Sequence, residues 1–175
     1  MSFNKYRLKG AYHYEWYETE DWYKQCVDRI VRFCKGVTLD IGCGDGLLLD
    51  KLESSGVQAF GIDKDPHAIK LCNERALEAH QYDIETLNIH NIISYMACLN
   101  VIEHLNKPEV LKDIIRNNIT KGAIIITLEW QGGAFGEDHK HEYTYDELLE
   151  FFKEFNPKGF RIKNHPEWIG VEIKK

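Results

Sequence analysis

The chain lacks the features that mark membrane-spanning, secreted and disulfide-linked proteins. Its 175 residues contain no apolar run of the length that crosses a bilayer, and the polar start lacks the apolar core of a secretion signal. The five cysteines are odd in number and include no Cys-x-x-Cys pair, which indicates reduced, mostly buried thiols rather than a disulfide framework or a zinc site. We therefore expect a cytoplasmic protein that does not contact a membrane.

The chain also lacks an excess of basic charge. It has 22 Lys and Arg against 28 Asp and Glu, and the net charge of −6 makes the surface as a whole a poor attractor of nucleic acid. Basic residues do gather near both ends, for example at Lys5, Arg7 and Arg161, but such residues usually form a solvated surface. The charge favours a small molecule or a protein as substrate, without excluding RNA.

What is present is an ordinary globular composition, with 43% hydrophobic and 29% charged residues. This length can bury a full core as one domain, and no repeat or linker marks a second one. We therefore expect residues 1–175 to form a single domain, of which residues 1–35 provide an amino-terminal segment and the first helix.

Strand and helix patterns alternate along most of the chain. We expect strands at residues 37–41, 57–62, near 82–83, and at 92–99, 123–128, 160–164 and 168–173, with helices at 22–34, 47–52, 65–79, from 108, and at 144–155. Right-handed crossovers would wind these strands into a mainly parallel, doubly wound α/β sheet with helices on both faces. The last two strands are separated only by residues 165–167, so they must form an antiparallel hairpin.

The strongest motif is a glycine-rich turn at residues 42–46, which follows an apolar strand and opens a helix. Glycine lets the backbone turn tightly and approach a ligand closely, because a Cβ atom would collide there or forbid the required φ. Roughly 20 residues later a second strand ends at Asp63, whose two oxygens can accept bonds from both hydroxyls of a ribose. This pair of features predicts a nucleoside site.

The same turn narrows the kind of nucleoside. The chain has no Gly-x-x-x-x-Gly-Lys-Ser/Thr phosphate loop, and Leu47 stands where a full Gly-x-Gly-x-x-Gly turn has a small residue, so a pyrophosphate cradle is disfavoured. The carboxylate of Asp40, just before the turn, also disfavours a dianionic ligand. A positively charged adenosine compound is the better match.

At this point the residues closely resemble the class I S-adenosylmethionine-dependent methyltransferases. The first motif of that family, Asp-x-Gly-x-Gly-x-Gly, is matched from Asp40 to Gly46, and the resemblance extends from about Val37 to the end of the chain. It implies a seven-stranded sheet with a terminal reversed pair, and S-adenosylmethionine as the cofactor. The cofactor-binding residues that we expect are Asp40, Gly42, Cys43, Gly44, Asp63, Lys64, Asp83, Ile84, Asn100 and Val101.

The resemblance also implies roles for the residues that follow the third and fourth strands. In the family, an acid at the position of Asp83 accepts a bond from the adenine amino group, and the amide of the next residue, Ile84, addresses a ring nitrogen. Asn100 and Val101 would lie beside the methionine part of the cofactor. The alternative is structural, with Asp83 capping a loop and Asn100 forming a turn.

Glu103 and His104 are candidate catalytic residues. Methyl transfer is an in-line displacement with a neutral leaving group, so positioning can supply most of the acceleration, and a base is needed only for an alcohol or ammonium acceptor. Histidine has a proton affinity suited to that task at neutral pH. Alternatively, both side chains only cap the next helix and border the cofactor.

A second polar cluster, residues 137–142, follows the fifth strand and is either a solvated loop or a contact for the acceptor. We include His141 among the candidate catalytic residues. With Glu103 and His104, His139 or His141 could form a metal site of two histidines and a carboxylate. This is similar to the small-RNA 3′-end 2′-O-methyltransferases, whose motif is Glu-x-x-Glu-His, but Asn100 replaces the first glutamate here, so we expect no metal.

The segment at residues 12–17 is dense in aromatic side chains and is either a lid over the cofactor or packing for the amino terminus. Together these features predict an S-adenosylmethionine-dependent methyltransferase acting on an oxygen or nitrogen of a small molecule. The alternatives are a metal-assisted RNA ribose 2′-O-methyltransferase and a non-catalytic S-adenosylmethionine-binding module. The sequence does not indicate the acceptor or the oligomeric state.

Overall fold

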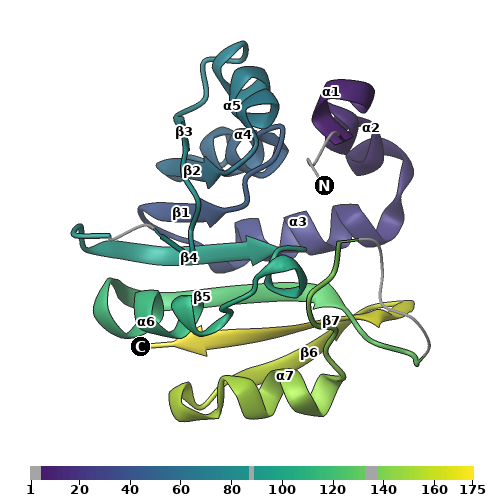
Figure 1. Ribbon diagram of the computed structural model, residues 1–175, viewed down its shortest axis with the longest axis vertical. Helices are drawn as coiled ribbons and strands as arrows, with labels where there is room; N and C mark the ends of the chain where they lie inside the picture. Colours follow the sequence, from purple (N-terminus) through teal and green to yellow (C-terminus); the bar gives the residue numbers. More distant parts are fainter. Residues whose placement is uncertain (1–4, 87–88, 133–137) are drawn as a thin grey trace.

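The computed structural model describes residues 5–86, 89–132 and 138–175. Its strands form a seven-stranded sheet in the order β3-β2-β1-β4-β5-β7-β6 (Figure 1). They are β1 (Thr38–Ile41), β2 (Ala59–Asp63), β3 (Ala79–Gln81), β4 (Ile93–Leu99), β5 (Ile119–Leu128), β6 (Lys158–Ile162) and β7 (His165–Lys174). Strands β1 to β5 pair in parallel, and β7 runs antiparallel to both β5 and β6. The predicted seven-stranded, mainly parallel sheet with a terminal hairpin is confirmed.

Helices cover both faces of this sheet, as predicted. They are α1 (Lys5–Lys9), α2 (Tyr12–Thr19), α3 (Asp21–Phe33), α4 (Leu47–Ser54), α5 (Pro66–Asn73), α6 (Glu109–Asn117) and α7 (Tyr145–Phe151), with short 3-10 turns η1 (Ile102–His104) and η2 (Lys153–Phe155). Ala97 and Ile124 belong to the core under α3 and α4, whereas their neighbours Cys98 and Ile125 belong to the core under α6 and α7. Consecutive residues of a strand point to opposite faces, so both faces of β4 and β5 are buried.

Strand β5 begins at Ile119, four residues before the predicted start at 123. Gly122 lies inside the strand, where the backbone of β7 passes close by. A Cβ atom at this position would lie 2.5 Å from the carbonyl oxygen of Ile173. Glycine therefore marks a close approach of two strands here, rather than a strand end.

The helix predicted at residues 65–79 is too long. Its start is correct, with Asp65 as N-cap accepting a bond from the N–H of His67, but α5 ends at Asn73. Ala76 then adopts a left-handed conformation with φ of 57°, and the N–H of Leu77 donates to the carbonyl oxygen of Cys72 at 3.1 Å. The chain turns at that point and enters β3, which ends at Gln81, slightly before the predicted end.

The connection predicted at residues 165–167 is also wrong, because those residues begin β7. The reversal occurs at Lys163 and Asn164, where Asn164 has φ of 64°. Asparagine tolerates this left-handed conformation better than other side chains with a Cβ atom. Pro166 is accommodated near the start of β7, beside the irregular pairing at Arg161.

The amino-terminal helices lie at the edge of the sheet where the parallel strands end. In Figure 1 the arrows of β4 and β5 point to the right, and α1 and α2 lie on that side. The predicted aromatic segment forms α2, and the predicted first long helix, α3, starts and ends within one residue of expectation. Thr144 forms the expected capping box with Glu147, although η2 replaces the last turn predicted for that helix.

Within the described ranges, the model contains no helix with the length and apolar character needed to span a membrane.

Candidate functional site

A cavity of about 340 Å³ lies at the carboxyl ends of β1, β2, β3 and β4, where ligands of open α/β sheets bind. Most of the predicted site residues line it, namely Asp40, Gly42, Cys43, Asp63, Lys64, Asp83, Ile84, Asn100, Val101, Glu103 and His104. Gly44 and His141 are not among the lining residues. The edge of the sheet at which these strands end thus brings together predicted site residues that are up to 64 positions apart in the sequence, from Asp40 to His104.

The glycine-rich turn is packed tightly against its surroundings. Gly42 has φ of 69°, and a Cβ atom there would lie 2.3 Å from Cγ2 of Val101. Gly44 has φ of 55°, and its Cβ atom would lie 2.3 Å from the hydroxyl oxygen of Tyr6. Both positions combine a left-handed backbone with a close approach, so only glycine meets both demands without strain.

Asp63 is held in place by the turn it faces. Its Oδ2 accepts a bond from the N–H of Gly44 at 3.0 Å, and its Oδ1 accepts one from the N–H of Asp65 at 2.8 Å. Each carboxylate oxygen has a second lone pair, so both can still accept bonds from a ligand. Gly44 does not line the cavity, but its N–H orients the carboxylate of Asp63, which does.

Asp40 adds a second acid to the same wall. Its side chain is buried, and burial, with a smaller effect from the charge of Asp63, raises its pKa well above the ordinary range. Burial also raises the pKa of Asp63. A positive charge in the cavity would stabilise the charged forms of both carboxyls, whereas a phosphate would destabilise them. This pair of carboxyl groups thus suits a cationic nucleoside, as the sequence predicts.

Asp83, after β3, caps a turn and also lines the cavity. Oδ1 of Asp83 accepts a bond from the N–H of Glu85 at 3.0 Å, so this carboxylate caps a turn. It also lines the cavity beside the buried side chain of Ile84. A capped carboxylate still has lone pairs for a ligand, so the turn fixes the orientation of Asp83 without preventing binding.

Asn100 is strained and carries a buried acceptor. Its backbone is left-handed, with φ of 55°, while its N–H donates to the carbonyl oxygen of Ile126 at 2.9 Å. Its Oδ1 is buried and has no hydrogen-bond partner among the described residues. An unsatisfied buried acceptor costs roughly 1–3 kcal/mol, so a ligand N–H or O–H at this position would be stabilising.

Glu103 and His104 lie in η1, directly after β4. Burial raises the pKa of Glu103 to about 7 and lowers that of His104 to about 4. The Nδ1 atom of His104 lies 3.3 Å from the carbonyl oxygen of Asp138. A carbonyl can only accept, so Nδ1 carries the hydrogen and Nε2 is the basic nitrogen of a neutral ring. His104 is therefore neutral at pH 7 and can accept a proton, but its lowered pKa makes it a weaker base than an ordinary histidine.

The loop after β5 places His139, rather than His141, beside this pair. The rings of His104 and His139 are 4.8 Å apart, and Glu103, His104 and His139 each offer a ligand atom within 4.8 Å of the others. The N–H of Lys140 donates to the carbonyl oxygen of Glu103 at 2.7 Å, which attaches the loop to η1. His141 is exposed and packs edge-on against Tyr143. Glu137, the first residue of the predicted polar cluster, lies outside the described residues.

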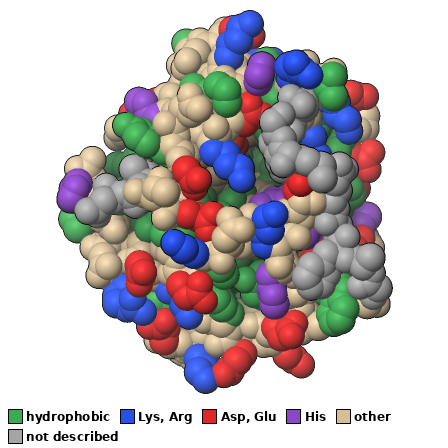
Figure 2. Space-filling view, in the orientation of Figure 1, with side chains coloured by type: hydrophobic (Ala, Val, Ile, Leu, Met, Phe, Trp, Pro, Cys, Tyr) green, Lys and Arg blue, Asp and Glu red, His purple; other side chains and the backbone are tan. Residues whose placement is uncertain are grey.

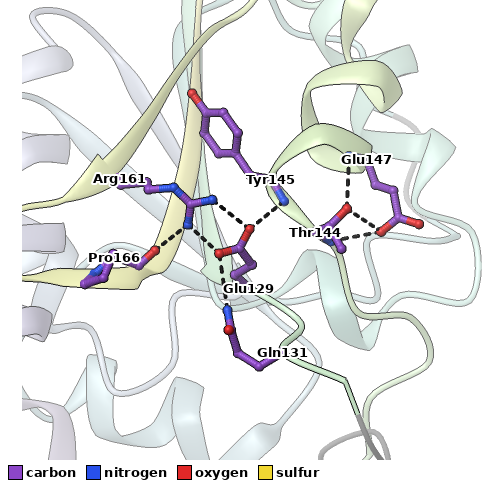
Figure 3. A network of polar contacts seen from close by, with 7 residues as sticks. All are labelled: Glu129, Gln131, Thr144, Tyr145, Glu147, Arg161 and Pro166. Atoms are coloured by element: carbon purple, nitrogen blue, oxygen red, sulfur yellow. Dashed lines mark hydrogen bonds and ion pairs between the residues drawn. The ribbon is translucent and has the colours of Figure 1, made fainter.

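A network that the sequence did not reveal anchors both ends of this loop (Figure 3). Glu129 makes a two-point ion pair with Arg161 and accepts a bond from the N–H of Tyr145 at 2.9 Å. Arg161 also donates to the carbonyl oxygen of Pro166 and lies over the ring of Tyr145. Gln131 donates to Glu129 at 3.2 Å. Glu129, the first residue after β5, is thus joined to Arg161 of β6 and to the backbone N–H of Tyr145, the first residue of α7.

A second contact missed from the sequence joins α2 to the glycine-rich turn. The fully buried carboxylate of Asp45 accepts a bond from the N–H of His13 at 2.9 Å, and Nδ1 of His13 lies 3.2 Å from its other oxygen. Tyr6, Tyr12 and His13 all line the cavity. The aromatic segment therefore packs onto the turn and also forms a wall of the cavity, while its opening and closing as a lid stays a prediction.

Comparisons with known proteins also identify a methyltransferase. The model of a methyltransferase-domain family matches residues 13–158. An uncharacterized methyltransferase of Schizosaccharomyces pombe is 32% identical over 123 residues, which cover 65% of this chain and 46% of that protein. A ubiquinone biosynthesis O-methyltransferase of Idiomarina loihiensis is 35% identical over 81 residues, or 42% of this chain and 33% of that protein. The chain spans less than half the length of these curated relatives.

Solved structures show the same fold at low sequence identity. A SAM-dependent methyltransferase from Archaeoglobus fulgidus superposes with a TM-score of 0.72 at 16% identity, covering 94% of this chain and 100% of that one. The methyltransferase domain of bacterial CtHen1-C gives a TM-score of 0.71 at 16% identity, covering 88% and 98%. From the family match and the fold, this chain belongs to the methyltransferase-domain family, within the class I S-adenosylmethionine-dependent methyltransferases that its glycine-rich turn resembles.

Proposed function

We propose that this chain binds S-adenosylmethionine in the cavity and transfers its methyl group to an oxygen or nitrogen of a small molecule. The observation that carries the proposal is Asp63, whose carboxylate is aimed by two backbone N–H groups at the carboxyl end of β2, next to the buried Asp40. Asp63 would accept both ribose hydroxyls, and the two acids would stabilise a cationic ligand. Asn100, through its unpartnered Oδ1, would accept a bond from the amino-acid part of the cofactor.

The remaining cavity residues would position the acceptor and take up its proton. When bound, S-adenosylmethionine supplies a methyl group on a positively charged sulfur. With a hydroxyl acceptor, the methyl group would pass from sulfur, which keeps the electron pair of the broken bond, to the acceptor oxygen, and Nε2 of His104 would take up the hydroxyl proton. The tautomer of His104, fixed by Asp138, supports this assignment.

Calorimetry with S-adenosylmethionine and with its demethylated product tests the binding step. Both ligands should bind, and Asp63→Ala should weaken binding by on the order of 2 kcal/mol, about thirtyfold in Kd. Asp63→Asn keeps one acceptor oxygen and should lose less. Asp113→Ala, which removes an exposed acid on α6, is the matched control. Absence of heat with either ligand would refute the proposal.

Turnover separates an enzyme from a binding module. Label from methyl-tritiated S-adenosylmethionine, offered with pooled metabolites, RNA or proteins, should appear in the metabolite pool, and His104→Ala should slow its transfer while leaving cofactor Kd almost unchanged. Binding without any transfer would instead support a non-catalytic module.

All five cysteines are free and buried, which supports our proposal of a reducing, cytoplasmic location.

A second candidate is metal-assisted methylation of an RNA ribose, favoured by the grouping of Glu103, His104 and His139. Nδ1 of His139 lies 2.6 Å from Oε1 of Glu142, and Nδ1 of His104 lies 3.3 Å from the carbonyl oxygen of Asp138, so each histidine has an outer partner of the kind that metal-binding histidines commonly have. Against a metal, Asn100 stands where the RNA methyltransferases have the first glutamate, so one anionic ligand is missing. Against an RNA acceptor, Figure 2 shows basic and acidic side chains intermixed on the face drawn. Stimulation of transfer by Mn²⁺ and its loss with chelator, using an RNA 3′ end as acceptor, would establish this candidate.

A further inference from the structure

The wall of the cavity changes character along the sheet. The part built by the ends of β1, β2 and β3 carries the acids Asp40, Asp63, Asp65, Asp83 and Glu85. By contrast, the lining residues that the described parts of α2, α3, β5 and β7 contribute include no Asp, Glu, Lys or Arg. Because β4 separates β1, β2 and β3 from β5 and β7 in the sheet, these acids lie on one side of β4, and the apolar residues Leu128 and Trp168 lie on the other. The charged side is used by the proposed cofactor site, and the uncharged side is left for the acceptor.

The uncharged side is dominated by rings, which we call the aromatic wall: Trp16, Trp22, Tyr23 and Trp168. Trp22 of α3 and Trp168 of β7 are stacked, with ring centroids 4.1 Å apart and planes within 3°. Trp16 packs edge-on against Trp22 at 5.7 Å and against Tyr23 at 5.8 Å. Each ring is thus held by another, so the wall is a rigid apolar surface.

Leu128 extends this surface on the strand beside Trp168. The two residues are direct partners in the β5–β7 ladder, and both line the cavity. Leu128 is 40% exposed, which is unusual for a large apolar side chain that directly follows six buried strand residues, 122–127. An uncovered leucine beside a wall of rings is a surface that an apolar ligand would bury.

We propose that the acceptor is an uncharged planar aromatic molecule bearing a hydroxyl group, whose ring lies against the aromatic wall and Leu128. The proposal rests on the function proposed above and specifies its acceptor. A flat ring gains stacking or edge-to-face contacts with tryptophan that a puckered aliphatic ring of the same size cannot make. A charged acceptor would lose hydration at this side without gaining a counter-charge from it.

A pair of matched probes tests the acceptor class. Catechol and cyclohexane-1,2-diol carry the same two hydroxyl groups, on a planar and a puckered ring. The phenolic hydroxyls of catechol are far more acidic than those of the diol, so the two are compared by affinity rather than by transfer rate. With the demethylated cofactor bound, calorimetry should give a Kd for catechol at least about tenfold lower than the Kd for the diol. Tritiated methyl from S-adenosylmethionine should also be transferred to catechol. Equal affinity for the two probes, tighter binding of the diol, or no transfer to catechol by protein that binds the cofactor would each overturn the proposal.

Tryptophan variants locate the acceptor. Trp168→Ala should raise KM for catechol about tenfold with little change in kcat, and Trp168→Phe, which keeps a planar ring, should restore most of the loss. Trp130→Ala is the matched control, because Trp130 is partly exposed on the same sheet edge but does not line the cavity. An equal rise in KM for both alanine variants would overturn the proposal.

Calorimetry with S-adenosylmethionine separates this proposal from the one on which it rests. The Kd of the cofactor should stay within about twofold in Trp168→Ala, which also shows that the variant is folded. If the wild-type protein binds no cofactor, the methyltransferase proposal itself fails. If the cofactor binds and the catechol results fail, only the acceptor class is wrong.

Discussion

Glu103 is a carboxyl group that the fold places in an environment where its charged form is costly. Its side chain is 3% exposed, and burial raises its pKa from the ordinary 4.5 to about 7. Between these two values the folded protein binds a proton that the unfolded chain releases. The free energy of unfolding must therefore fall as pH rises through this window and become independent of Glu103 above it.

Glu103→Gln should remove that dependence, because the amide is neutral at every pH. Relative to the wild type, the variant should gain stability between about pH 5 and about pH 8 by up to roughly 3 kcal/mol. Urea unfolding at both pH values, with chelator present to keep the protein metal-free, measures the change. Glu154→Gln, which alters an exposed glutamate, should show no such gain. A pH-independent difference between wild type and Glu103→Gln would contradict the assigned burial effect.

Single residues also mark where sequence patterns stop being informative. The glycine-rich turn and Asp63 were predictable, because a short local pattern specifies a tight turn at a strand end. The left-handed Ala76 that ends α5 was not, since alanine gives no signal for that conformation. His13 was noted only as part of an aromatic segment, because its partner Asp45 lies 32 residues away and only tertiary packing brings them together.

At the scale of elements, the buried strands were the most predictable parts, because β4 and β5 are apolar on both faces. The ends of elements were less so. The loop from β5 to α7 shows why: Glu129 and Arg161 fasten it from positions 32 residues apart, and nothing local in either sequence indicates the other. Which of the two histidines, His139 or His141, lies beside Glu103 and His104 depends on how this loop is anchored.

Arg161→Leu should loosen that anchoring. Loss of the two-point ion pair should cost about 1 kcal/mol of stability, since Arg161 is partly exposed. Because the loop carries His139, we expect a larger effect on KM for the acceptor than on Kd for S-adenosylmethionine. Arg116→Leu removes a comparable two-partner arginine between α6 and η2, away from the cavity, and should change stability only. Identical acceptor kinetics in the two variants would show that the network serves stability alone.

At the scale of the whole molecule, the alternation of strands and helices predicted the architecture, and the pairing of β7 with both β5 and β6 agrees with it. The cavity was predictable in its acidic part, which follows β1 to β3 in chain order. Its aromatic part was not, because Trp22 and Trp168 meet from opposite ends of the sequence. Long-range contacts of this kind depend on the complete packing of the chain.

Ligand binding should stabilise the molecule as a unit, because residues from the amino-terminal helices and from strands β1, β2, β4, β5 and β7 line one cavity. The demethylated cofactor at about one hundred times its Kd should add roughly 2.7 kcal/mol, which raises Tm by about 5–10 °C for a chain of this size. Scanning calorimetry measures the shift. Asp63→Ala at the same ligand concentration should show a smaller one, and an equal shift would place the ligand elsewhere.

The contact between His13 and Asp45 holds the amino-terminal helices at the cavity, and this matters to anyone who produces the protein. Lys5, the first residue of α1, lines the cavity, whereas Lys175 lies at the opposite edge of the sheet, where its N–H donates to the carbonyl oxygen of Lys121. Purification tags or fluorescent labels therefore belong after Lys175, where they leave the entry route for small molecules unobstructed.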